Sequence, residues 1–121
     1  GRIAREAREL TAAHLDRQGT PYGLVGHSHI PFIFEDARDG PLMQPVVDSA
    51  TVELGPTRFV ANPGGLGQPR DGDPRAAYAV LDTTDRSLTF HRVEYDIALT
   101  QARMEEAGLP AFLSERLSRG R

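Results

Sequence analysis

The chain has 121 residues, 39% of them hydrophobic and 26% charged, and this ordinary globular composition fits one domain and excludes a disordered chain. The formal net charge of -3 disfavours a nucleic-acid partner, and no apolar run is long enough to span a membrane. Cysteine is absent, which excludes disulfides, thiolate metal sites and cysteine nucleophiles, so a metal ion would need His, Asp, Glu or Asn ligands.

The first segment, residues 2–18, predicts a helix because its apolar residues recur at helical spacing and should face the core. This stripe comprises Ile3, Ala7, Leu10 and then Ala13 or His14. Gly19, Thr20 and Pro21 should end the helix. The chain starts without Met inside this helix, so we expect it to be part of a longer protein. We also expect a cytoplasmic protein, because the N-terminus carries no secretion signal.

Short strands and turns are predicted next. Residues 22–25 are an apolar run between the helix and a glycine, which predicts a buried strand of an α/β unit. Further strands are expected at residues 32–35, 46–54 and 58–61, with turns at 39–41 and 55–56. Residues 62–75 are rich in glycine and proline and predict a loop, and residues 76–81 and 88–95 predict a hairpin.

The C-terminal segment predicts two helices. Asp96 should cap a helix that runs to about Ala107, and Gly108 should end it. Pro110 suits the first turn of a last short helix to about Leu117. Residues 118–121 should fray.

Two histidines, His27 and His29, directly follow the first predicted strand. On a regular strand, side chains at i and i+2 point to the same face, so both imidazoles would address one site. This site would lie at the carboxyl end of a strand, where α/β sheets place their ligands. Two neutral imidazoles could chelate one metal ion or bind two neighbouring ions. A pair of surface or hydrogen-bonded histidines is the alternative.

The sequence around these histidines resembles a known family. Residues 26–31, GHSHIP, resemble the last metal-binding block of the calcineurin-like metallophosphoesterases, usually GHTHxP, with Ser28 in place of threonine. Residues 62–71, NPGGLGQPRD, are similar to the NPGSVGQPRD stretch of the small bacterial branch of that superfamily, and residues 73–78 continue in register. The segment from residue 93 to residue 117 also resembles the C-terminal tail of that branch.

The resemblance implies the C-terminal half of a two-sheet α/β sandwich, β-rich and flanked by helices. Residues 1–121 would form the C-terminal part of one metallophosphoesterase domain. Its parts would be a helix at 1–19, strands and loops at 22–95, and helices at 96–118.

The resemblance also implies an activity, the hydrolysis of a phosphomonoester or phosphodiester at a centre of two divalent metal ions, Mn, Fe, Ni or Zn. By analogy, His27 and His29 would each bind a different ion. The family's D-x-H, bridging-aspartate and G-N-H blocks and a further upstream histidine are missing from this chain, so we expect it to be inactive alone. A non-catalytic binding or scaffolding module of the same fold is the alternative.

Other polar residues are secondary candidates. Arg70 and Arg75 flank the glycine- and proline-rich loop and are candidates to bind the phosphate of a small-molecule substrate, with plain surface arginines as the alternative. We assign His14 and His91 structural roles. Asn62 should shape the Asn-Pro-Gly turn through backbone hydrogen bonds. A homo-oligomer is left open.

Overall fold

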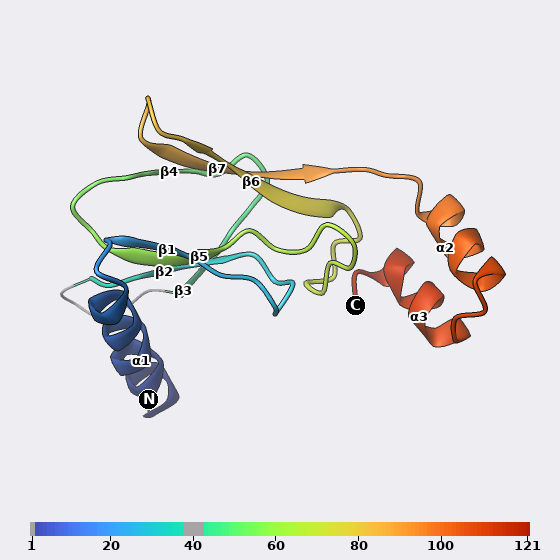
Figure 1. Ribbon diagram of the computed structural model, residues 1–121, viewed down its shortest axis with the longest axis horizontal. Helices are drawn as coiled ribbons and strands as arrows, with labels where there is room; N and C mark the ends of the chain where they lie inside the picture. Colours follow the sequence, from blue (N-terminus) through green and yellow to red (C-terminus); the bar gives the residue numbers. More distant parts are fainter. Residues whose placement is uncertain (1, 38–42) are drawn as a thin grey trace.

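The computed structural model describes the backbone of residues 2–37 and 43–121, and the side chains from residue 9 onward within these ranges. Two β-sheets lie one above the other, a helix lies outside the lower sheet, and a helical hairpin lies beyond one end of the strands (Figure 1). This mixed α/β arrangement, with a helix before and helices after the strands, confirms the predicted fold class.

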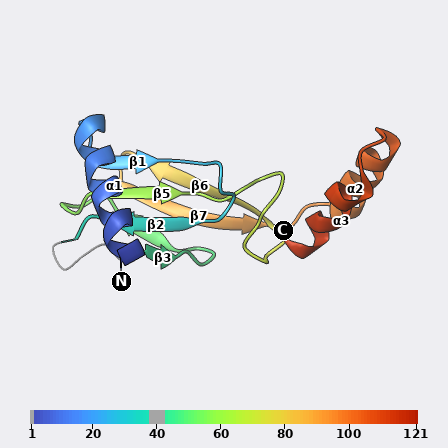
Figure 2. The ribbon, with the colours of Figure 1, turned by 90° about the horizontal axis from the view of Figure 1, so that it is seen from below.

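The strands form a four-stranded sheet of order β1-β5-β2-β3 and a three-stranded sheet of order β4-β7-β6. Their bounds are β1 Tyr22–Leu24, β2 Phe32–Glu35, β3 Met43–Pro45, β4 Thr51–Glu53, β5 Phe59–Asn62, β6 Ala76–Asp82 and β7 Ser87–Val93. The faces of the two sheets overlap (Figure 2). The buried core between them comprises Ile33, Phe59, Ala61, Leu88 and Phe90. Because neighbouring residues of a strand point to opposite faces, β5 supplies Phe59 and Ala61 to this core, and β7 supplies Leu88 and Phe90.

Parallel pairing of β1 with β5 determines which loops are neighbours. Tyr22 pairs with Phe59 and Leu24 with Ala61, so both strands end at the same edge of the sheet. The Val25 N–H extends this pairing by donating to the Ala61 carbonyl at 2.9 Å. The histidine-bearing loop after β1 and the Asn-Pro-Gly loop after β5 therefore start side by side.

Strand β1 is an edge strand in the described part of the sheet, which corrects the prediction of a buried strand. It pairs on one side only, and Leu24 is 58% exposed. A cavity of about 260 Å³ adjoins it, lined by Thr20, Tyr22, Leu24, Leu54, Phe59, Leu81 and Leu88. Tyr22 and Leu24 therefore line a partly open space between the sheets.

The N-terminal helix, α1 (Arg2–Gln18), has the predicted bounds, but its predicted apolar stripe is wrong where it is described. Leu10 is 72% exposed, whereas Leu15, which lies off that stripe, is 1% exposed. The helix contacts the described strands at β1 and β5, and its first turns extend away from the sheet (Figure 1). The side chains of Ile3 and Ala7 lie outside the described residues.

The prediction of one strand over residues 46–54 is also wrong. The chain leaves the four-stranded sheet after β3, turns, and enters the three-stranded sheet at β4. Ser49 has a positive φ of 66°, and its N–H donates to the Phe90 carbonyl at 2.8 Å. A left-handed residue breaks a regular strand. The predicted turn at residues 39–41 lies outside the described residues.

The C-terminal segment matches its predicted helices but not its predicted fraying. Helix α2 (Ile97–Glu106) begins after Asp96, whose carboxylate accepts from the Leu99 N–H at 2.8 Å, and α3 (Ala111–Glu115) follows Pro110. A 3-10 turn, η1 (Arg116–Arg119), continues the chain, and the Gly120 carbonyl accepts from the Gly72 N–H at 3.0 Å. This contact holds the tail on the Asn-Pro-Gly loop. Among the described helices, none has the length and hydropathy needed to cross a bilayer.

Candidate metal-ligand site

The two histidines lie in the loop after β1, not on a regular strand as the spacing predicted. Strand β1 ends at Leu24, and both His27 and His29 have positive φ, 74° and 59°. Positive φ is uncommon for residues other than glycine, and histidine is among those that adopt it more readily. The argument that i and i+2 share one face of a strand therefore does not apply here. Instead, two left-handed residues set the directions of the imidazoles.

His27 is the central residue of a three-residue turn. The Ser28 N–H donates to the Gly26 carbonyl at 3.0 Å, an i to i+2 bond, and His27 between them has a φ of 74°. This is a γ-turn with positive φ, a rare and strained conformation. A residue in such a conformation costs about 1–3 kcal/mol, so the surroundings must hold it there, and such residues cluster at functional sites. The imidazole of His27 is exposed.

His29 is held from the other side by the loop after β5. Its Nδ1 lies 2.7 Å from the Gln68 carbonyl oxygen, and its own carbonyl accepts from the Arg70 N–H at 3.3 Å. A carbonyl oxygen can only accept, so Nδ1 carries a proton, and in the neutral imidazole Nε2 keeps its lone pair. A metal-binding histidine commonly donates its other ring N–H to a carbonyl or carboxylate in this way, which fixes the tautomer and the ring orientation.

Gly65 leaves room for the His29 ring. A Cβ at Gly65 would lie 3.1 Å from the His29 Cβ and 3.3 Å from its Cγ, tighter than ordinary van der Waals contact. The absence of a side chain at Gly65 therefore allows the loop after β5 to approach the imidazole closely.

The residues present fit a metal site as a partial set of ligands. His29 has a fixed tautomer with Nε2 available, and His27 is an exposed imidazole two positions away. In the part of the chain that the structure describes, no group of three or more His, Asp or Glu side chains could hold a metal ion. A complete site needs further ligands, because metal sites in proteins generally use three or more protein ligands or add water.

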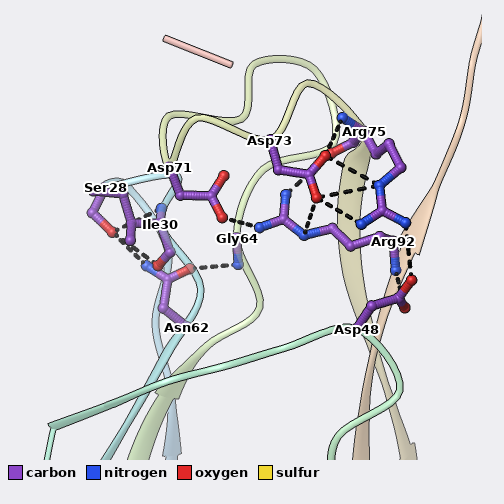
Figure 3. A network of polar contacts seen from close by, with 9 residues as sticks. All are labelled: Ser28, Ile30, Asp48, Asn62, Gly64, Asp71, Asp73, Arg75 and Arg92. Carbon is purple, nitrogen blue, oxygen red and sulfur yellow. Dashed lines mark hydrogen bonds and ion pairs between the residues drawn. The ribbon is translucent and has the colours of Figure 1, made fainter. Parts of the chain in front are cut away.

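Asn62 connects the two loops. It is fully buried at the end of β5. Its Oδ1 accepts from the Gly64 N–H at 2.9 Å, and its Nδ2 donates to Ser28 Oγ (Figure 3). The same Nδ2 also donates to the Gly26 carbonyl. The contact with Gly64 confirms the predicted role of Asn62 in the Asn-Pro-Gly turn. The sequence did not reveal the other two contacts.

The candidate arginines have different surroundings. Arg75 donates to Asp73 at 2.7 Å and to Asp48 at 3.0 Å, so two carboxylates already neutralise its charge. Arg70 is exposed, and its guanidinium donates to Gln68 Oε1 at 2.9 Å. Of the two, only Arg70 has no acidic partner recorded in the described part of the chain.

Arg92 joins Arg75 in a network of ion pairs next to these loops (Figure 3). Its side chain is only 7% exposed, pairs with Asp71, and donates to the Arg75 carbonyl at 3.1 Å. The network ties the loop after β5, residues 63–75, to β7. We assign it a structural role.

The carboxylates of this network predict a loss of stability in acid. A hydrogen bond from the Arg75 side chain holds the pKa of Asp73 below its ordinary value, and a hydrogen bond from the Arg92 backbone N–H, with the nearby Arg75 charge, lowers the pKa of Asp48. A carboxyl with a lowered folded pKa stabilises the protein above its unfolded pKa, about 3.9, and this contribution disappears as pH falls through the folded pKa. The free energy of unfolding should therefore decrease as pH falls below about 4.

Asp73→Asn tests the source of this acid sensitivity. The variant should have a lower free energy of unfolding than the wild type at pH 7 and should lose less of it below about pH 4. When the free energy from denaturant titrations is plotted against pH, the two curves should therefore converge in acid. Wild-type and variant curves that run parallel from pH 7 to pH 2.5 would contradict the assignment.

Comparison with known proteins gives a family. No protein-family model matches the chain. The crystal structure of a metallophosphoesterase from Sphaerobacter thermophilus matches 84% of this chain with a TM-score of 0.80 and 45% identity, over 43% of that protein's chain. An uncharacterized protein of Methanocaldococcus jannaschii is 39% identical over 98 residues, which are 80% of this chain and 38% of that protein. The chain thus spans less than half the length of either relative. With this fold and this identity, the chain belongs to the metallophosphoesterases and corresponds to the C-terminal part of the solved member.

Proposed function

We propose that the protein is a metal-dependent phosphoesterase that hydrolyses a phosphomonoester or phosphodiester, with His27 and His29 among the ligands of two divalent metal ions. Membership of the metallophosphoesterases supports the class of reaction. The observation that carries the proposal for this chain is the contact of His29 Nδ1 with the Gln68 carbonyl at 2.7 Å, because it leaves Nε2 free to bind a metal ion.

The roles of this chain's residues follow from their positions. His27 and His29 hold the metal ions, and the Gln68 carbonyl keeps the His29 ring in one tautomer and orientation. When bound, the divalent ions supply charge that polarises the phosphoryl oxygens and lowers the pKa of the attacking water. The further ligands would come from outside the described residues.

Arg70 is the better candidate to bind substrate phosphate. Its guanidinium is exposed and has one neutral partner, Gln68 Oε1, so its charge is available to an anion. Arg75 would first have to leave Asp73 and Asp48. A direct role for Arg75 in substrate binding stays a prediction, as do a cytoplasmic location and a homo-oligomer.

Metal analysis tests the proposal. We expect the full-length protein, reconstituted with Mn, Fe, Ni or Zn and then dialysed, to retain about two ions per subunit, because upstream ligands complete the site. The 121-residue chain alone should hold these ions only loosely and should not hydrolyse a chromogenic phosphodiester.

The same measurement distinguishes the alternative of a binding or scaffolding module. A full-length protein that is folded but retains none of the four metals would argue against the enzyme and for the module. Metal-dependent turnover by the 121-residue chain would contradict the need for upstream ligands.

A further inference from the structure

Asn62 makes more contacts than an Asn-Pro-Gly turn requires. The turn needs only Oδ1, which accepts from the Gly64 N–H at 2.9 Å. Because an N–H donor faces Oδ1, the amide has one orientation, with both Nδ2 hydrogens directed to the loop after β1. They reach the Gly26 carbonyl at 3.0 Å and Ser28 Oγ at 2.9 Å.

These two acceptors lie on either side of His27. The Gly26 carbonyl is also the acceptor that closes the γ-turn, since the Ser28 N–H donates to it at 3.0 Å. One amide group of Asn62 therefore binds the residue before and the residue after the strained His27. Ser28 Oγ in turn accepts from the Ile30 N–H at 3.3 Å, so the chain of hydrogen bonds from Asn62 continues to the residue after His29.

The donor of these contacts is buried. Asn62 has 0% of its surface exposed, and its two hydrogen bonds to the loop are partly buried, so removing the amide takes away donors that solvent replaces only incompletely. Without the Nδ2 donors, the loop would lose the contacts that offset the cost of the left-handed backbone at His27.

We propose that Asn62 is a positioning residue for metal binding, which holds the γ-turn at residues 26–28 and thereby the direction of the His27 imidazole. The inference rests on the proposed function, because it assigns His27 to the metal. It adds a residue from the loop after β5 to a site whose histidines come from the loop after β1. Asn62 acts through His27 and does not itself touch the metal or the substrate.

The test uses the full-length protein and Mn²⁺ alone, with free Mn²⁺ measured by electron paramagnetic resonance. Asn62→Ala should weaken Mn²⁺ binding about 10- to 100-fold, the range found when groups that orient metal ligands are removed. Ser28→Ala removes one of the two anchors and should weaken binding by a smaller factor. Ser28→Thr retains the hydroxyl and should bind like the wild type.

A control variant separates positioning from general destabilisation. Leu88→Ala removes a core side chain that is 2% exposed and should lower the Tm, yet it leaves all the contacts of Asn62 in place, so its Mn²⁺ affinity should equal that of the wild type. In the metal-free protein, the NMR chemical shifts of the His27 imidazole should differ from the wild type in Asn62→Ala and equal those of the wild type in Leu88→Ala.

The outcomes separate the inference from the function on which it rests. An Asn62→Ala protein that binds Mn²⁺ as tightly as the wild type would overturn the positioning role and leave the proposed function intact. Equal loss of Mn²⁺ affinity in Leu88→Ala would also overturn it, because the effect would then follow stability. A wild-type protein that binds neither Mn²⁺ nor Fe, Ni or Zn would overturn both.

Discussion

Replacing His29 by alanine should abolish most metal-dependent phosphoesterase activity of the full-length protein. The substitution removes Nε2, the free nitrogen of an imidazole whose Nδ1 is fixed by the Gln68 carbonyl at 2.7 Å. Loss of a group that only orients a ligand costs about 10- to 100-fold in metal affinity or activity, so the loss of a ligand should cost more than about 100-fold. Metal content after dialysis and kcat/KM for a chromogenic phosphodiester measure the two effects together.

Two further variants serve as comparisons for His29→Ala. His91 stacks on Tyr78 with ring centroids 5.1 Å apart, outside the two loops, so His91→Ala should keep both metal and activity. Arg70→Ala should keep the metal and lower kcat/KM by roughly 10- to 100-fold, because one charge-assisted hydrogen bond is worth about 1.5–3 kcal/mol. An active His29→Ala protein that retains two ions would overturn the assignment of the histidine pair.

Replacing Gly64 by alanine should cause the largest loss of stability among single changes in the loop after β5. Gly64 has a φ of 97°, and a Cβ there would lie 2.6 Å from the Ala77 Cβ, closer than real Cβ atoms come. The left-handed backbone costs an alanine about 1–2 kcal/mol, and forcing a methyl group into a packed site costs about 1–3 kcal/mol. We expect the free energy of unfolding to fall by about 2–5 kcal/mol in denaturant titrations.

Gly67→Ala is the matched control in the same loop. Beyond its two chain neighbours, no residue has an atom within 4 Å of a Cβ built at Gly67, and its φ is not in the left-handed region. This variant should change the free energy of unfolding by no more than about 0.5 kcal/mol. Equal stability of the two alanine variants would show that the backbone at Gly64 is not constrained as described.

The sequence predicted the elements whose boundaries are set by local chemistry. Asp96 caps α2, Gly108 ends it with a φ of 73°, and the polar turn between β6 and β7 joins an antiparallel hairpin as predicted. These features depend on a few neighbouring residues, so a single sequence contains the information.

Elements set by distant contacts were predicted wrongly. Residues 46–54 are apolar enough for one strand, but the chain changes sheets where Ser49 bonds to Phe90, 41 positions away in β7. The tail was expected to fray because it is the end of the chain, yet the Gly120 carbonyl accepts from the Gly72 N–H at 3.0 Å. Contacts of this kind leave no periodic pattern in the sequence.

The geometry of the candidate site was predicted only in part, because it also depends on distant contacts. The spacing of His27 and His29 marked the loop, but the strand geometry used to pair them was wrong, because both have positive φ. The role of Asn62 was predicted only within its own turn. Its contacts with Gly26 and Ser28 lie 36 and 34 positions away and depend on the parallel pairing of β1 with β5. Predicting the parallel pairing of β1 with β5 would have placed the two loops next to each other.

The positive φ at His27 and His29 also limits which amino acids can replace them. Apart from glycine, the residues that adopt this backbone most readily are asparagine, aspartate and histidine. Aspartate and asparagine carry oxygen donors, which suit hard cations such as Mg²⁺, Ca²⁺ and Mn²⁺, whereas imidazole nitrogen suits Zn²⁺, Ni²⁺ and Fe²⁺. The backbone of this loop thus accepts the residues that coordinate metals and resists the β-branched ones that do not. Exchanges among the accepted residues would shift the donor set from nitrogen toward oxygen, so the metal preference of the proposed site would change while its loop geometry is kept.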